Sequence, residues 1–142
     1  MAAPESFSRV PMQINVIGKG TLKAEIIKHL APSTTALIIR RGKVFGRVTL
    51  EPDSVVILTN IKAGSEKPKY QFSAGDIAYL PLNGALCIFV KDSAASRPMN
   101  HVGRVTADGG LLKKIGRGDT IVFEVEEAAQ AASPSPAETN PA

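Results

Sequence analysis

The chain has 142 residues, enough for one domain with a buried core, and 44% of them are hydrophobic but only 5% aromatic. It contains a single Cys, which excludes an intramolecular disulfide and the zinc clusters that need several thiolates. No apolar run approaches the ~20 residues of a transmembrane helix, and the N-terminus lacks the basic start and apolar core of an export signal. We therefore expect a soluble protein of the cytoplasm that does not associate with membranes.

The formal net charge of +4 is unevenly distributed. Residues 1–118 contain all 17 Lys and Arg residues and 8 acidic residues, which gives this part a net charge of +9. Such an excess would suit binding to RNA or another polyanion. The basic residues occur singly or in pairs, however, and no aromatic residues alternate with them, which is typical of a solvated surface. We favour the solvated surface and keep nucleic-acid binding as an alternative.

The first structured segment is predicted to be a β-hairpin. Residues 10–16 and 22–26 alternate apolar and polar side chains around the glycine-containing loop 18–20. Residues 21–30 also fit an amphipathic helix. The hairpin is the preferred interpretation because Pro32 favours extended backbone just before it.

Residues 32–41 are predicted to form a short α-helix. A proline lies in the first turn, and the hydroxyls of Ser33 and Thr34 could satisfy free backbone donors. Two arginines lie at the C-terminal end of the segment, where cations are favourable, and Gly42 supplies the left-handed residue that ends a helix.

The remaining segments are short apolar runs separated by turn residues. The pair Asn83 and Gly84 is the strongest hairpin signal, because both residue types tolerate positive φ. The six apolar residues 85–90 show no alternation, which indicates a strand buried on both faces. Residues 111–115 predict a second helical turn. Further strands are predicted at residues 44–50, 55–60, 70–72, 77–80, 101–106 and 121–126, with a charged loop at 63–69 and a polar loop at 91–100.

Many short strands with two brief helices predict a mainly β fold, a closed β-barrel capped by two short α-helices. We expect the domain to span residues 10–127, after a disordered leader at 1–9. Residues 128–142 are rich in Ala, Pro and Ser, a composition that is typical of a disordered tail.

The order of these elements resembles the small prokaryotic (archaeal and bacterial) cyclophilin-like domain family over residues 10–126. The segments that carry the resemblance are PSTTALIIRRG, GDIAYLPLNGALCIFV, HVGRV and LLKKI. Members of this family are mostly uncharacterised. The resemblance implies a cyclophilin-like barrel with a cleft.

True cyclophilins isomerise X-Pro bonds with an arginine and an apolar wall that favour the twisted amide. By resemblance, Arg47 matches their essential arginine and His101 loosely matches a cleft histidine, while Tyr79 would line the cleft. Leu86 stands where cyclophilins have an active-site glutamine, which counts against catalysis. Each candidate also has a structural interpretation: an exposed strand arginine, a half-buried histidine and a packed tyrosine. Cys87 is interpreted as a small core hydrophobe.

The leading hypothesis is a non-catalytic barrel that binds an unidentified peptide or small molecule in an apolar cleft with a few polar groups. The alternative is a weak peptidyl-prolyl isomerase, which requires Arg47 to point into that cleft. Binding of RNA or another polyanion by the basic surface is the third hypothesis. The sequence assigns no catalytic residue, no metal and no cofactor, and it does not specify an oligomeric state.

Overall fold

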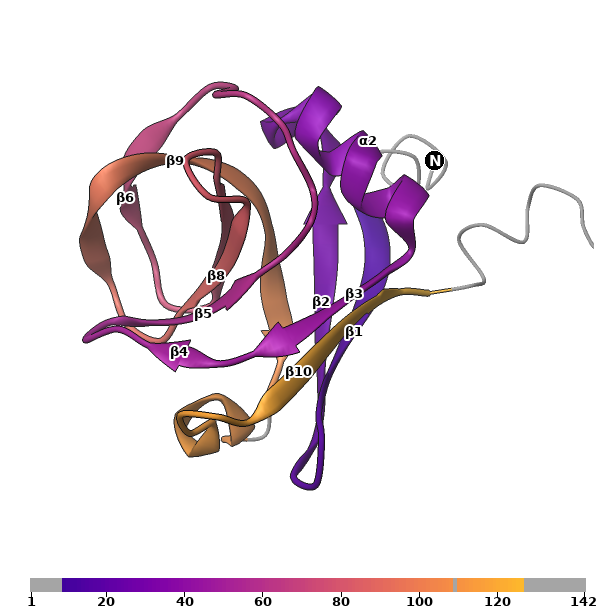
Figure 1. Cartoon of the computed structure of the whole chain (residues 1–142), viewed down its shortest axis with the longest axis vertical. Helices are drawn as coiled ribbons and strands as arrows, with labels where there is room; N and C mark the ends of the chain where they lie inside the picture. The colour runs from indigo at the N-terminus through magenta and orange to yellow at the C-terminus, as the bar shows by residue number, and fades with distance from the viewer. Residues whose placement is uncertain (1–8, 109, 127–142) are drawn as a thin grey trace, which may run out of the picture.

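Antiparallel strands dominate the structure, a computed structural model that describes residues 9–108 and 110–126 (Figure 1). The predicted tail lies outside the described residues, as does the predicted leader except Arg9, which begins the first strand. Within the described part, the strands are β1 (Arg9–Val16), β2 (Gly20–Ile27), β3 (Lys43–Arg47), β4 (Thr49–Leu50), β5 (Ser54–Leu58), β6 (Lys69–Phe72), β7 (Asp76–Leu80), β8 (Ala85–Phe89), β9 (Ser93–Ala107) and β10 (Thr120–Val125). One α-helix, α2 (Pro32–Arg41), and two 3-10 turns, η1 (Lys28–Leu30) and η2 (Leu111–Lys114), complete this part of the chain.

The strands form one sheet in the order β3-β10-β1-β2-β9-β7-β8-β5-β4, with β6 paired to β9. The mainly β prediction is confirmed, but the closed barrel is corrected: no hydrogen-bonded pairing among the described residues joins the end strands β3 and β4. The chain itself connects them through Val48, which leaves the ladder because its N–H donates to Asp119 O and its carbonyl accepts from Gly118 N. These bonds, at 2.7 Å and 3.1 Å, divide the single predicted strand 44–50 in two.

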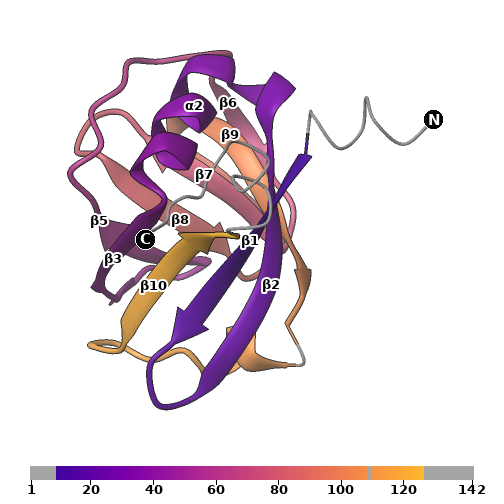
Figure 2. The same cartoon turned by 90° about the vertical axis from the view of Figure 1, so that its right-hand side faces the viewer.

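Helix α2 has the predicted bounds. Gly42 follows it with a φ of 78° and donates its N–H to Ile38 O, which ends the helix. The N-terminus differs from the prediction, because the hydroxyls of Ser33 and Thr34 do not cap it. Their backbone N–H groups instead donate to the carboxylate of Glu66, from the loop between β5 and β6. The helix lies across one end of the strands (Figure 2).

The second predicted α-helix is corrected to the 3-10 turn η2, which has only four residues and follows Gly110 in left-handed conformation. The predicted hairpin of residues 10–26 is confirmed as β1 and β2, paired from Arg9↔Ile27 to Val16↔Gly20.

The predicted polar loop 91–100 is wrong in most of its length, because residues 93–107 form the long strand β9. Its N-terminal half pairs with β6, and its C-terminal half pairs with β7 and β2. This half contacts the smaller cluster only through Ala95 and Met99, which show no period-two alternation, so the sequence pattern alone did not indicate a strand.

The apolar residues form two clusters on opposite faces of β7 and β8. The main core fills the space beneath α2 and includes Leu86 and Ile88 of β8. The smaller cluster lies on the other face of these strands and consists of Phe72, Ala78, Ala85, Cys87 and Phe89. All five residues of β8 are buried, which confirms the strand predicted to be buried on both faces. In Figure 1, β9 and β6 curve around β8. Phe72 of β6 belongs to the smaller cluster, and Ala95 and Met99 of β9 pack against it.

Candidate functional site

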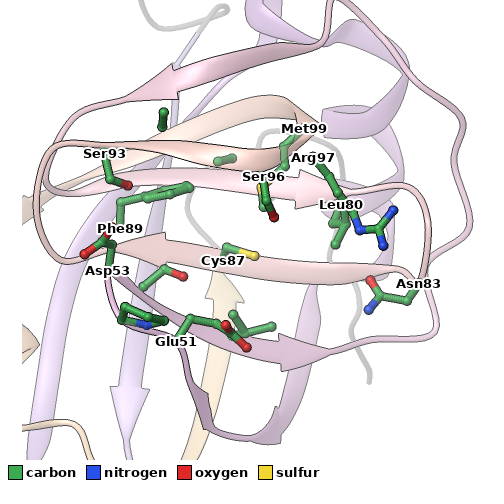
Figure 3. A pocket seen from close by; sticks show the side chains of 15 residues that line it. Glu51, Asp53, Leu80, Asn83, Cys87, Phe89, Ser93, Ser96, Arg97 and Met99 are labelled. Carbon is green, nitrogen blue, oxygen red and sulfur yellow. The ribbon is translucent and has the colours of Figure 1, made fainter.

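An open cleft of about 460 Å³ lies over the smaller cluster (Figure 3). Its walls come from three segments that are distant in sequence: the β4–β5 turn, the β7–β8 turn and the N-terminal half of β9. We call it the β8 cleft. Its apolar floor consists of Val56, Leu80, Cys87, Phe89 and Met99, and its polar rim of Glu51, Asp53, Ser54, Asn83, Ser93, Ser96 and Arg97.

The floor follows from the alternation along β8. Cys87 and Phe89 point to the side opposite Leu86 and Ile88, and the ring of Phe89 stacks on Phe72 with 4.7 Å between centroids. The Cys87 side chain lies at the centre of the floor (Figure 3), and the residue is 1% exposed. Burial, helped by the negative charge of Glu51, raises the pKa of Cys87 to about 12. The thiol is therefore protonated at neutral pH and contributes apolar surface rather than a nucleophile.

A wide bulge in β9 shapes the opposite wall. The register places Gln71 opposite Ala94 and Lys69 opposite Met99, so a single residue of β6 faces the four residues 95–98 of β9. Pro98 lies in this interval and has no N–H to give to a ladder. Bulges redirect side chains. Here the bulge contains Ser96 and Arg97, both of which line the cleft.

Opposite charges lie at different places on the rim. Figure 3 shows the guanidinium of Arg97 beside the amide of Asn83 at one end, with Asp53 beside Phe89 at the other. Asp53 forms an ion pair with Lys91 at 3.2 Å. Within the described part of the chain, Glu51 and Arg97 take part in no salt bridge. The cleft therefore presents an anion and a cation that no described residue pairs with, around an apolar floor.

Two of the residues that the sequence suggested for a cleft belong to the main core. Tyr79 and Leu86 are cross-strand partners on β7 and β8, and both are buried. The Tyr79 hydroxyl donates to Ile61 O at 2.6 Å and accepts from Ala63 N at 3.0 Å. The tyrosine thus fixes the loop after β5 from inside the protein, and neither residue lines the β8 cleft.

The other two predicted residues also lie away from the β8 cleft. His101 Nε2 is 2.9 Å from Gly103 O and 3.4 Å from a carboxylate oxygen of Asp76. Burial lowers the pKa of His101, although the Asp76 carboxylate acts in the opposite direction, so the ring is neutral at pH 7. Arg47 is exposed on β3. The four predicted residues are therefore not brought together in one site.

Sequence reasoning missed the polar rim residues because each lies in a segment interpreted as a connection. Glu51 was part of a turn signal, Asn83 part of the hairpin dipeptide, and Arg97 part of the predicted polar loop. Only the order β9-β7-β8-β5 in the sheet brings these segments together. One sequence feature could have pointed to these residues. The predicted polar loop 91–100 is long for a connection between two strands.

Basic residues gather at a second hollow, of about 280 Å³, between the end of α2 and the chain after β5. It is lined by Arg40, Arg41 and Lys62 with the apolar Leu37 and Ile61. The Arg41 guanidinium donates to Asn60 O at 3.5 Å. Three of the basic residues of the polyanion hypothesis therefore line one hollow.

The described residues contain neither a metal-ligand cluster nor a membrane-spanning helix. No group of three or more His, Cys, Asp or Glu side chains there is arranged to hold a metal ion. None of the described helices has both the length and the apolar character needed to cross a membrane.

Comparison with known proteins decides the family. The sequence pattern of the cyclophilin-like family matches residues 10–124. The chain belongs to the cyclophilin-like family. This cyclophilin-like protein is similar to the hypothetical protein AF2241 from Archaeoglobus fulgidus, with a TM-score of 0.69, 21% identity, and coverage of 84% of this chain and 96% of the other.

A second solved structure, McbB in complex with tryptophan, superimposes with a TM-score of 0.65 and 11% identity. The match covers 81% of the cyclophilin-like protein and 44% of McbB, so this chain spans less than half of McbB. No curated protein sequence matches the chain. At these identities the structural similarities establish the fold of this cyclophilin-like protein alone.

Proposed function

We propose that this protein binds a small organic molecule or a short peptide in the β8 cleft, without catalysis. The observation that carries the proposal is the combination of a concave apolar floor with a rim of separate polar groups. Binding sites for small ligands are typically clefts of about 300–1,000 Å³ with this composition, and the β8 cleft has about 460 Å³. Its floor is a packed part of the fold, so the binding surface is largely pre-formed.

The side chains of the cleft support binding more than chemistry. A serine or cysteine nucleophile requires an adjacent base or a lowered pKa. Burial raises the pKa of Cys87 instead, and the described residues that line the cleft include no histidine or lysine. The likeness to McbB, which was solved with tryptophan, recommends amino acids as part of a ligand screen.

The test is a panel of amino acids, nucleosides, organic acids and short peptides, screened by thermal shift and confirmed by calorimetry. The variant Ser96→Trp places an indole over the cleft from an exposed rim position. Thr21→Trp, on an exposed position of β2, is the matched control. We expect at least one compound to bind the wild type and Thr21→Trp equally but to bind Ser96→Trp weakly. Equal binding to all three proteins, or no binding by any compound, would contradict the proposal.

We also propose a cytoplasmic location. The single cysteine, Cys87, is buried as a free thiol, a state that suits a reducing compartment. Cell fractionation tests this, and recovery of the protein in an exported fraction would refute it.

A further inference from the structure

The rim of the β8 cleft separates one anion from one cation. Glu51 comes from the β4–β5 turn and Arg97 from the bulge in β9, and both residues are exposed at the edge of the cleft. A guanidinium and a carboxylate on facing walls could pair directly, yet these two form no salt bridge with each other. The separation leaves both charges available to a ligand that lies between them.

The bulge in β9 explains why Arg97 lies on the rim of the β8 cleft. An uninterrupted pairing of β9 with β6 would have one residue of β9 opposite Tyr70, whereas the structure has residues 95–98 there. The residues of this interval lack regular ladder pairing with β6, and in Figure 3 the Arg97 side chain points toward the end of the cleft where Asn83 lies. Guanidinium groups bind carboxylates with two parallel hydrogen bonds, and an amide adds a further donor. This end of the cleft therefore has the chemistry of a carboxylate site.

The other wall has the chemistry of an ammonium site. Glu51 and Asp53 flank Pro52 in the β4–β5 turn, and Asp53 already pairs with Lys91. Of these two carboxylates, Glu51 forms no ion pair with the described residues. Its charge acts on the cleft floor, since it contributes to the raised pKa of Cys87 after the larger effect of burial.

The distance between the two ends limits the length of the ligand. Ser54 is opposite Phe89 at one end of the β5–β8 ladder, and Leu58 is opposite Ala85 at the other. The four residue steps from Phe89 to Ala85 span about 13 Å at about 3.3 Å per residue. A free amino acid carries both charges on one Cα and therefore covers only a small part of this backbone span. An extended chain of three residues covers about 10 Å, and the long side chains of Glu51 and Arg97 bridge the remainder.

We propose that the β8 cleft recognises a short linear peptide of about three residues with both termini free. Its carboxylate binds Arg97 and Asn83, its ammonium group binds Glu51, and an apolar middle side chain lies over Cys87 and Phe89. This inference rests on the proposed function of the cleft and adds the chemical class of the ligand. It distinguishes free peptides from segments within a protein chain, which carry no terminal charges.

The probe is an equimolar mixture of tripeptides with apolar middle residues and varied end residues. The same mixture is prepared with N-terminal acetylation, with C-terminal amidation, and with both. Retention by the full-length protein is measured by ultrafiltration and mass spectrometry. We expect the free mixture to be retained and either modification to weaken retention about tenfold, as expected for the loss of one charge-assisted contact at a partly exposed site.

Variants assign each terminus to its residue. Arg97→Gln should bind the free and amidated mixtures equally, and Glu51→Gln should bind the free and acetylated mixtures equally. Arg117→Gln and Glu124→Gln change exposed charges that do not line the cleft, and they should retain the wild-type preference. Thermal unfolding of each variant confirms that it is folded.

Equal retention of the free and doubly modified mixtures, or retention of no tripeptide, would overturn the inference. The proposed function fails separately. If the compound panel yields a ligand that Ser96→Trp excludes while no tripeptide binds, the cleft is a binding site and only the tripeptide assignment is wrong. If neither the panel nor the tripeptides bind, both proposals fail.

Discussion

Loss of the Glu66 carboxylate should loosen the N-terminus of helix α2. Helix N-termini carry backbone N–H groups without partners inside the helix, and α2 has no acidic residue in its first turn. The Glu66 carboxylate accepts from Ser33 N, Thr34 N and the Thr34 hydroxyl, each at 2.8 Å. The amide of Asn100 also donates to the Thr34 hydroxyl at 3.0 Å, so this contact connects the helix to β9.

The magnitude follows from these contacts. A hydrogen bond to a charged group contributes about 1.5–3 kcal/mol, but Glu66 is only half-buried, and solvent screening reduces that figure. Loss of a helix N-cap typically costs about 1 kcal/mol. We therefore expect Glu66→Gln to lower the free energy of unfolding by about 1 kcal/mol at pH 7, and the melting temperature by about 4 °C. Glu124→Gln, an exposed substitution in β10, should change neither.

The pH dependence gives the sharper test. Burial alone would raise the pKa of Glu66, but the hydrogen bonds from Ser33 and Thr34 hold the pKa below its usual value. The unfolded state therefore takes up a proton first, and the stabilisation present above about pH 4.3 is lost as the pH falls through the folded-state pKa. Urea unfolding from pH 7 to pH 3 should show the wild type and Glu66→Gln converging in acid. Equal stability at pH 7, or a difference that does not shrink as the pH is lowered, would refute this reasoning.

Three further outcomes are expected. Tyr79→Phe should lower the free energy of unfolding by about 1–3 kcal/mol, because Ile61 O and Ala63 N lose their hydrogen-bond partner. Ligand binding should not change, and weakened binding in a folded variant would place Tyr79 in the site. Gly103→Ala should cost about 3 kcal/mol, because its Cβ would fall on the backbone carbonyl of Glu25, whereas Gly64→Ala, which has open space, should be nearly neutral in the same urea titration. In a protease-coupled assay on X-Pro peptides, neither the wild type nor Arg47→Ala should accelerate isomerisation, and acceleration that the substitution abolishes would establish an isomerase.

Elements whose ends or burial are set by their own residues were predictable from the sequence. Pro32 and Gly42 bound helix α2, and each acts through its own backbone. The run of apolar residues in β8 likewise indicated a strand buried on both faces, and all five of its residues are buried. The family resemblance and the mainly β class were accessible for the same reason, because they depend on the order of such segments.

Features that depend on hydrogen bonds between residues distant in the sequence were not predictable. Val48 interrupts a strand because it bonds to residues 118 and 119, about half the chain away. Glu66 caps a helix that begins more than 30 residues earlier, a role that no local pattern encodes. The first half of β9 is polar and is held by backbone pairing with β6, so it was interpreted as a loop. Arg97 was therefore not considered as a candidate, and the residues suggested by the resemblance to cyclophilins lie outside the β8 cleft.

The most direct test of the account is backbone-amide NMR of the ¹⁵N-labelled protein titrated with the free tripeptide mixture. We predict that shift changes gather at the β8 cleft, at Cys87, Ser96 and Arg97. Changes gathered instead at the basic hollow around Arg41, with the cleft amides unmoved, would contradict it.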